Sequence, residues 1–203
     1  MNSIKKILFS ILIIYSTYVS AEEPLSITQS LWEDVKVLKG IPSVVGFKNT
    51  ELYVFFDPNC YVCAELFDLS KNEQQSERAL NVKAHAINII GNLPPSMWIP
   101  INQMKDSSRD MSIALLRSGS FNDIEKNYTE FDFDKLIGST KEIVPTDSEI
   151  TLLAKSKNIW KRLGGGTPLF VFRDKNGNFK KFTGIPPLAQ LHRIIDSISI
   201  RDK

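Results

Sequence analysis

The two cysteines of the chain, Cys60 and Cys63, stand three positions apart and are the only ones in 203 residues. The apolar run at residues 52–56 precedes them and predicts a short buried strand. Residues 64–69 predict the helix that follows. Cys60 is therefore expected at the start of a helix, where free backbone N–H groups and the helix dipole favour a thiolate. Cys63, one turn later, lies on the same helix face and is close enough to Cys60 to form a disulfide with it.

This pair predicts redox chemistry. A low-pKa outer sulfur with a second sulfur one turn inward is the minimum set of groups for thiol–disulfide exchange. The alternative is a small structural disulfide, whose short loop would constrain the unfolded chain little. A zinc site needs about four ligands, and beyond the cysteines the chain offers His85 and His192 as its only histidines. We therefore expect no metal, and no cofactor besides the Cys60–Cys63 disulfide.

The first 21 residues have the pattern of a secretory signal peptide. Lys5 and Lys6 precede an apolar run at residues 7–15, and small residues ending at Ala21 mark a cleavage point. The run is too short for a membrane span, although an uncleaved anchor is the alternative. Loss of Lys5 and Lys6 from the 25 basic residues balances the 23 acidic ones. With no dense basic block, we expect no nucleic-acid partner. Export to an oxidising compartment favours paired cysteines.

Residues 22–50 are expected to form an N-terminal helix and a lead-in segment. The helix is indicated by apolar residues at helical spacing, namely Leu31, Trp32, Val35 and Leu38. Residues 51–203 are expected to form the main domain. In it, the helix that starts near Cys60 is predicted to reach about residue 79, and residues 82–90 are predicted to form the next strand.

A helical insertion is predicted at about residues 93–163. Within it, residues 111–117 predict a helix, and Thr146 with Glu149 forms a capping-box pattern at the start of another. After a glycine run, residues 169–172 and 179–182 predict a hairpin around Asn176-Gly177, and a last helix follows Pro186-Pro187. The order predicts an α/β fold of the thioredoxin type, with the helical insertion between its βαβ and ββα units.

The run Phe56-Asp57-Pro58-Asn59-Cys60-x-x-Cys63, with Gly166-Thr167-Pro168 downstream, resembles the DsbC/DsbG branch of secreted bacterial thiol:disulfide oxidoreductases. The resemblance covers roughly residues 32–198. It implies that Cys60 is the attacking thiol and Cys63 the resolving thiol. It also implies that Pro168 is a cis-proline and that Thr167 offers backbone groups to an extended substrate segment. Tyr61 is expected to be exposed beside the active sulfur, where it could contact unfolded clients.

The sequence departs from this branch at two places, and from thioredoxins at a third. The dipeptide between the cysteines is Tyr61-Val62, whereas the branch usually has Gly or Pro followed by Tyr. Residues 22–50 are too few for the dimerisation domain of the family's isomerases, so we expect a short form that is a monomer. Thioredoxins place a buried acid six residues before the first cysteine, where this chain has Val54. Glu51 and Glu65 are candidate proton acceptors for Cys63 by their proximity in the chain.

The resemblance implies a periplasmic thiol:disulfide oxidoreductase, of reductase or isomerase type, that acts on exported proteins with disulfides. As a reductase it would need a membrane thiol reductant. The short form resembles DsbG-like proteins associated with conjugation or type IV secretion systems, whose components are possible partners. The alternative from another class is a non-catalytic, thioredoxin-fold accessory subunit of such a system, with a structural Cys60–Cys63 disulfide.

Overall fold

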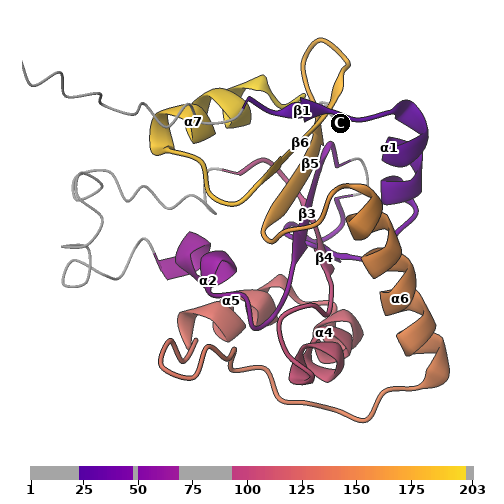
Figure 1. Cartoon of the computed structure of the whole chain (residues 1–203), viewed down its shortest axis with the longest axis vertical. Coiled ribbons are helices and arrows are strands. Elements are labelled where there is room, and N and C mark those ends of the chain that lie inside the picture. Colours follow the sequence, from indigo (N-terminus) through magenta and orange to yellow (C-terminus); the bar gives the residue numbers. More distant parts are fainter. Residues whose placement is uncertain (1–22, 48–49, 69–92, 200–203) are drawn as a thin grey trace, which may run out of the picture.

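The computed structural model describes residues 23–47, 50–68 and 93–199. Its centre is a six-stranded sheet with the order β1-β6-β5-β3-β4-β2 (Figure 1). The strands are β1 (Leu25–Ser26), β2 (Ile41–Pro42), β3 (Leu52–Phe56), β4 (Met97–Pro100), β5 (Leu169–Arg173) and β6 (Phe179–Thr183). The helices are α1 (Gln29–Lys36), α2 (Tyr61–Asp68), α4 (Ser107–Ser118), α5 (Phe121–Thr129), α6 (Asp147–Arg162) and α7 (Leu188–Ser197).

Strand β3, which leads to the cysteines, lies inside the sheet. It pairs with β4 in parallel and with β5 in antiparallel orientation, and β5 continues into the hairpin with β6. A parallel pair needs a crossover connection, and α2 begins the one between β3 and β4. Helices α4, α5 and α6 separate β4 from β5. The predicted α/β arrangement, with helices inserted between a βαβ unit and a ββα unit, is confirmed.

Two hydrophobic clusters cover the two faces of this sheet, because successive strand residues point to opposite sides. Leu52, Val54 and Phe56 of β3 join the cluster formed with α2, α4, α5 and α7, and this cluster contains both cysteines. Tyr53 and Phe55 join the cluster formed with α1 and α6. Figure 1 shows α2 and α7 on one side of the sheet and α1 and α6 on the other. The cysteines therefore belong to one face only.

The parallel neighbour of β3 differs from the predicted one. The strand predicted at residues 82–90 and the end of the helix predicted from Cys60 to about residue 79 lie outside the described residues. In the described part, β3 pairs with β4, which lies inside the region predicted to be helical. The run is four residues long and has Pro95 before it and Pro100 at its end. Proline is unfavourable within strands, so these prolines weaken the strand pattern of the run, and β4 was not predicted for that reason.

The N-terminal helix is confirmed and packs on its own domain. The Thr28 hydroxyl caps α1 by accepting a hydrogen bond from the Leu31 N–H at 3.3 Å. Trp32 and Val35 are buried, and the Trp32 ring stacks on Phe179 at a centroid distance of 5.1 Å. This apolar stripe is therefore used inside the chain. The signal peptide predicted at residues 1–21 lies outside the described residues. Within the described ones, no helix is both long and apolar enough to cross a membrane.

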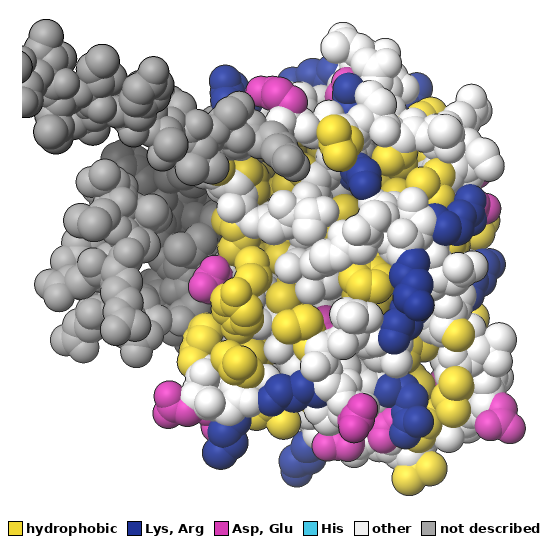
Figure 2. All heavy atoms as spheres, viewed as in Figure 1, with side chains coloured by type: hydrophobic (Ala, Val, Ile, Leu, Met, Phe, Trp, Pro, Cys, Tyr) yellow, Lys and Arg dark blue, Asp and Glu magenta, His cyan; other side chains and the backbone are white. Residues whose placement is uncertain are grey.

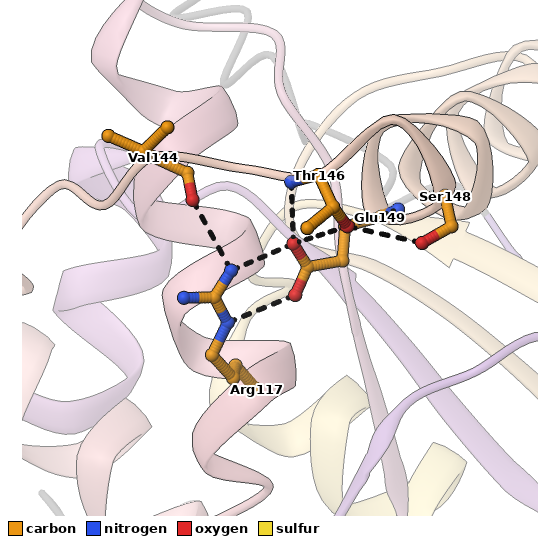
Figure 3. A network of polar contacts seen from close by, with 5 residues as sticks. All are labelled: Arg117, Val144, Thr146, Ser148 and Glu149. Atoms are coloured by element: carbon orange, nitrogen blue, oxygen red, sulfur yellow. Dashed lines mark hydrogen bonds and ion pairs between the residues drawn. The ribbon is translucent and has the colours of Figure 1, made fainter.

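Helix α6 begins with the predicted capping box (Figure 3). The Thr146 hydroxyl accepts a hydrogen bond from the Glu149 N–H, and the Glu149 carboxylate accepts one from the Thr146 N–H at 2.8 Å. Arg117 of α4 binds the same carboxylate through two nitrogens, at 3.0 and 2.8 Å. The hydrogen bond from Arg117 is the main cause that lowers the Glu149 pKa to about 2. The cap therefore also joins α4 to α6.

We predict that Thr146→Ala lowers the free energy of unfolding by about 1 kcal/mol, because a helix N–H loses its acceptor. Thr151→Ala is the matched control, since it removes the same hydroxyl from within α6, where that hydroxyl bonds to the Asp147 carbonyl. The control should change stability by less than about 0.5 kcal/mol. Urea unfolding of both variants measures the difference. Equal effects of the two changes would show that the cap contributes nothing of its own.

Candidate active site

Cys60 stands directly before α2 and caps it with its sulfur. Its carbonyl accepts the first hydrogen bond of the helix, from the Ala64 N–H at 3.1 Å. Its Sγ accepts a hydrogen bond from the Cys63 N–H at 3.3 Å. The sulfur thus takes the place of the side-chain oxygen that usually caps a helix. Both cysteines are free thiols in this structure, and Cys63 lies one turn further into α2.

The Thr167–Pro168 loop lies directly before β5, the neighbour of β3, and contacts this sulfur; its peptide bond is cis, as predicted. The Thr167 hydroxyl donates a hydrogen bond to Cys60 Sγ at 3.2 Å. The Thr167 carbonyl lies 3.5 Å from the same sulfur and accepts from it when it is a thiol. Gly166, before this loop, has a φ of +85°, and a Cβ there would lie 2.3 Å from a methyl carbon of Thr183. Glycine at this position therefore lets the chain pass close to Thr183 of β6 just before the Thr167–Pro168 loop.

The surroundings shift the pKa values of the two thiols in opposite directions. The pKa of Cys60 is lowered, chiefly by the hydrogen bond with the Cys63 side chain and further by the Thr167 hydroxyl and the Cys63 N–H, while burial opposes this. The pKa of Cys63 is raised well above its usual range, chiefly by burial and next by its bond to Cys60. Hydrogen bonds to a charged form stabilise it, whereas burial disfavours it. One sulfur is therefore suited to be a thiolate and the other a thiol.

The site residues differ in their exposure to solvent. Tyr61 is 44% exposed, as expected, whereas Cys60 is only 2% exposed because its sulfur packs against the Thr167 loop and the core. Pro168 is buried and Thr167 is half-buried. Figure 2 shows apolar side chains gathered over the region of α2 and α5. The structure thus brings Cys60, Cys63, Thr167 and Pro168 together and places Tyr61 beside them at the surface.

The loop before Cys60 is held by a buried carboxylate. Asp57 is fully buried, and one of its oxygens accepts from the Asn59 N–H at 2.8 Å and from the Ser108 hydroxyl at 2.7 Å. The other oxygen accepts from the N–H groups of Gln103 and Met104, at 2.5 and 2.9 Å. A carboxylate offers about four lone-pair sites, so all four are occupied here. Such a charge is tolerated in the interior because every site is satisfied.

The helical insertion binds the rest of this loop. Asn127 of α5 donates to the Pro58 carbonyl at 2.9 Å, and the Tyr128 hydroxyl donates to the Asp57 carbonyl at 2.7 Å. The Gly138 N–H donates to the Asn59 side chain at 3.1 Å. Sequence reasoning gave these insertion residues no role, since each is 69 or more positions from its partner. The Asp57-Pro58-Asn59 motif was the one local signal for this arrangement.

Neither acid that the sequence suggested as the proton acceptor of Cys63 faces that sulfur. Glu51 precedes β3, at the end of the strand away from the cysteines, and lies 4.0 Å from Arg173. Glu65 is exposed and two positions from Cys63, and helix residues with that spacing point to different faces. The carboxylate whose charge acts on both sulfurs is Asp57, which raises the pKa of each. Both proximity-based candidates are therefore wrong.

The described residues contain no group of three or more His, Cys, Asp or Glu side chains placed to hold a metal ion. His192 lies on α7, and His85 is outside the described residues. Asn127, which opens an Asn-x-Thr pattern, is fully buried and engaged with the loop before Cys60. The polar groups gathered at the end of β3 thus serve the two sulfurs and the loop that carries them.

We predict the pH dependence of the reaction of Cys60 with iodoacetamide in the reduced protein. The pH at which the rate reaches half its maximum should lie below about 8.5, the usual pKa of a free cysteine. A lowered pKa means that the thiolate persists to lower pH, so the curve moves in that direction. Restricted access of the reagent to the buried sulfur reduces the rate at every pH, whereas the midpoint reports the pKa, in which the effect of burial is already included. Thr167→Val removes the hydroxyl donor and should move the midpoint upward. A midpoint at or above 8.5 in the unaltered protein would contradict the lowered pKa.

Comparisons with known proteins support the fold. No family model matches the sequence, and no curated protein matches it. A periplasmic thioredoxin-like protein from Salmonella enterica serovar Typhimurium is 13% identical, with a TM-score of 0.53, over 85% of this chain and 97% of that one. ScsC from Proteus mirabilis, in a transitional conformation, is 20% identical, with a TM-score of 0.51, over 82% of this chain and 76% of that one. At these identities the likeness is one of fold, and the chain has the thioredoxin-like fold.

Proposed function

We propose that this protein is a thiol:disulfide oxidoreductase that uses Cys60 and Cys63 as its redox pair. The observation that carries the proposal is the asymmetry between the sulfurs. Three donors converge on Cys60, namely the Thr167 hydroxyl, the Cys63 N–H and the Cys63 thiol. Cys63 is fully buried, with its pKa raised. A structural disulfide has no need for this difference, whereas exchange needs one ionised and one protonated sulfur.

The exchange would run in two steps. The Cys60 thiolate attacks a disulfide sulfur of the client, forming a mixed disulfide and releasing one client thiolate. Cys63 then attacks Cys60 Sγ and releases the second client sulfur as a thiol, so the client is reduced by two electrons and the pair is oxidised. Thr167, with Pro168, would bind the extended client segment, and Tyr61 would contact its apolar side chains. An isomerase cycle differs in its second step, where a client thiol displaces Cys60.

We further propose a periplasmic location and a DsbC/DsbG-like activity on exported proteins. Residues 1–21 have a signal-peptide pattern, and the Salmonella neighbour is a periplasmic protein. A membrane thiol reductant would return the pair to its reduced form, and components of a secretion or conjugation system are candidate partners. We propose a monomer, because the apolar stripe of α1 packs on its own sheet.

One observation favours the alternative of a non-catalytic accessory subunit. Cys60 is 2% exposed, and a structural cysteine is buried and inert whereas a reactive one is accessible. The two candidates differ in what happens when the second sulfur is removed. A reactive Cys60 would then hold a client in a mixed disulfide, and a structural one would hold nothing.

We predict that Cys63→Ala accumulates mixed disulfides with exported proteins in its own host, because the resolving thiol is absent. Cys60→Ala is the matched control and should trap few or none, since its remaining sulfur is buried with a raised pKa. Non-reducing gels with a reduced lane for comparison detect the adducts. An absence of adducts with Cys63→Ala, or equal amounts with both variants, would support the accessory-subunit alternative.

A further inference from the structure

Tyr128 is a buried phenol that the two-step exchange does not use. It lies on α5, is 1% exposed, and is held between aromatic rings, stacked on Phe67 at 4.9 Å and edge-on to Phe56 at 6.1 Å. Its hydroxyl donates to the Asp57 carbonyl at 2.7 Å. A ring packed in this way has a fixed position, so its hydroxyl is held at the end of β3 where the cysteine loop begins.

Tyr128 packs with Cys63 in one buried cluster, and the Asp57 carbonyl that accepts from its hydroxyl also accepts from the Cys60 N–H at 2.9 Å, so the hydroxyl lies at the turn that carries both sulfurs. The pKa of Tyr128 is raised well above its usual range, chiefly by burial and further by the charges of the two sulfurs and a hydrogen bond with Cys63. Cys63 has no solvent exposure, so water cannot solvate a thiolate there. Its polar surroundings in the described residues include the Cys60 sulfur, the Asp57 N–H and the Tyr128 hydroxyl. A hydroxyl can rotate its single proton to suit its partner. Tyr128 can therefore donate to the Asp57 carbonyl while Cys63 is a thiol, and to the sulfur when Cys63 is ionised.

The acid nearest to this sulfur is unsuited to take its proton. All four lone-pair sites of the Asp57 carboxylate are occupied by the four donors described above. Its negative charge raises the Cys63 pKa and so opposes ionisation. The buried-acid position of thioredoxins carries Val54, which is fully buried in the same cluster. Among the described residues, a donor that stabilises the thiolate is therefore the group best suited to lower the barrier to resolution.

We propose that Tyr128 is a catalytic residue of the resolving step, whose hydroxyl donates a hydrogen bond to Cys63 Sγ as that sulfur becomes a thiolate. This inference rests on the proposed exchange function. In the step, the Cys63–Cys60 S–S bond forms and the bond between Cys60 and the client sulfur breaks. The proton of Cys63 leaves with the released client sulfur, so atoms and charge balance. Tyr128 keeps its own proton throughout.

An aromatic disulfide whose released thiolate absorbs visible light separates the two steps. When the reduced protein is mixed with excess reagent in a stopped-flow instrument, attack by Cys60 releases one aromatic thiolate. Resolution by Cys63 releases a second one in a later phase. Tyr128→Phe removes the hydroxyl and keeps the ring. Tyr53→Phe is the matched control, because it removes a buried phenol from the other face of β3, in the cluster without cysteines.

We expect Tyr128→Phe to slow the second phase about 10- to 100-fold, the effect of a lost hydrogen bond to a charged group, and to leave the first phase unchanged. The pH midpoint of its second-phase rate should also rise, because the Cys63 thiolate loses its donor. Tyr53→Phe should keep both phases. An unchanged second phase in Tyr128→Phe, or an equal slowing of both phases, would overturn the inference, since the latter is the result of a purely structural role.

A second variant covers the case in which Tyr128→Phe does not fold. With 3-fluorotyrosine incorporated at position 128, the phenol is more acidic and is a stronger donor in nearly the same volume. The second phase should become faster and its pH midpoint lower, while a second phase identical to that of the unaltered protein would overturn the inference. A protein that shows no first phase at all would remove the proposed function, and this inference with it.

Discussion

The burial of the Asp57 carboxylate, with four hydrogen-bond donors around it, is the interaction on which the site depends. The donors come from the cysteine loop itself, from the segment after β4, and from the start of α4. A buried charge without these partners would be strongly destabilising, so the three segments must be in place together. Because Asp57 lies three positions before Cys60, this requirement also fixes the point at which the chain enters α2.

The Asp57 charge also opposes ionisation of both thiols. The hydrogen-bond donors around each sulfur then determine which of the two thiols is ionised more readily. Asp57 raises the pKa of both thiols. At Cys60 the converging donors outweigh the combined effect of Asp57 and burial, so its pKa is lowered. At Cys63 burial dominates, and its pKa is raised. A proton is therefore retained on the inner sulfur until the outer one has reacted, which suits a resolving thiol.

Patterns among neighbouring residues predicted most of the helices and strands. The contacts that build the site could not be predicted, because they join residues far apart in the sequence. The capping box at Thr146 and the hairpin at Asn176-Gly177 were found because their signals lie within a few neighbouring residues. Strand β4 was missed because it is four residues long and ends in a proline. Three of the four partners of the Asp57 carboxylate were missed because they lie 46 to 51 positions away, with no spacing rule to reveal them. Burial of Cys60 likewise depends on Thr167, which is 107 positions away.

The helical insertion is therefore part of the site. In the described structure, Ser108 of α4 and Asn127 and Tyr128 of α5 all bind the loop that carries Cys60. Arg117 joins α4 to the start of α6, the helix that leads to the Thr167 loop. The insertion thus contacts the cysteines' loop directly and reaches the loop on their other side through α6. Changes in these helices can alter the acidity of either sulfur while the sheet stays unchanged, because the strands of the described structure supply none of the polar groups that bind the loop.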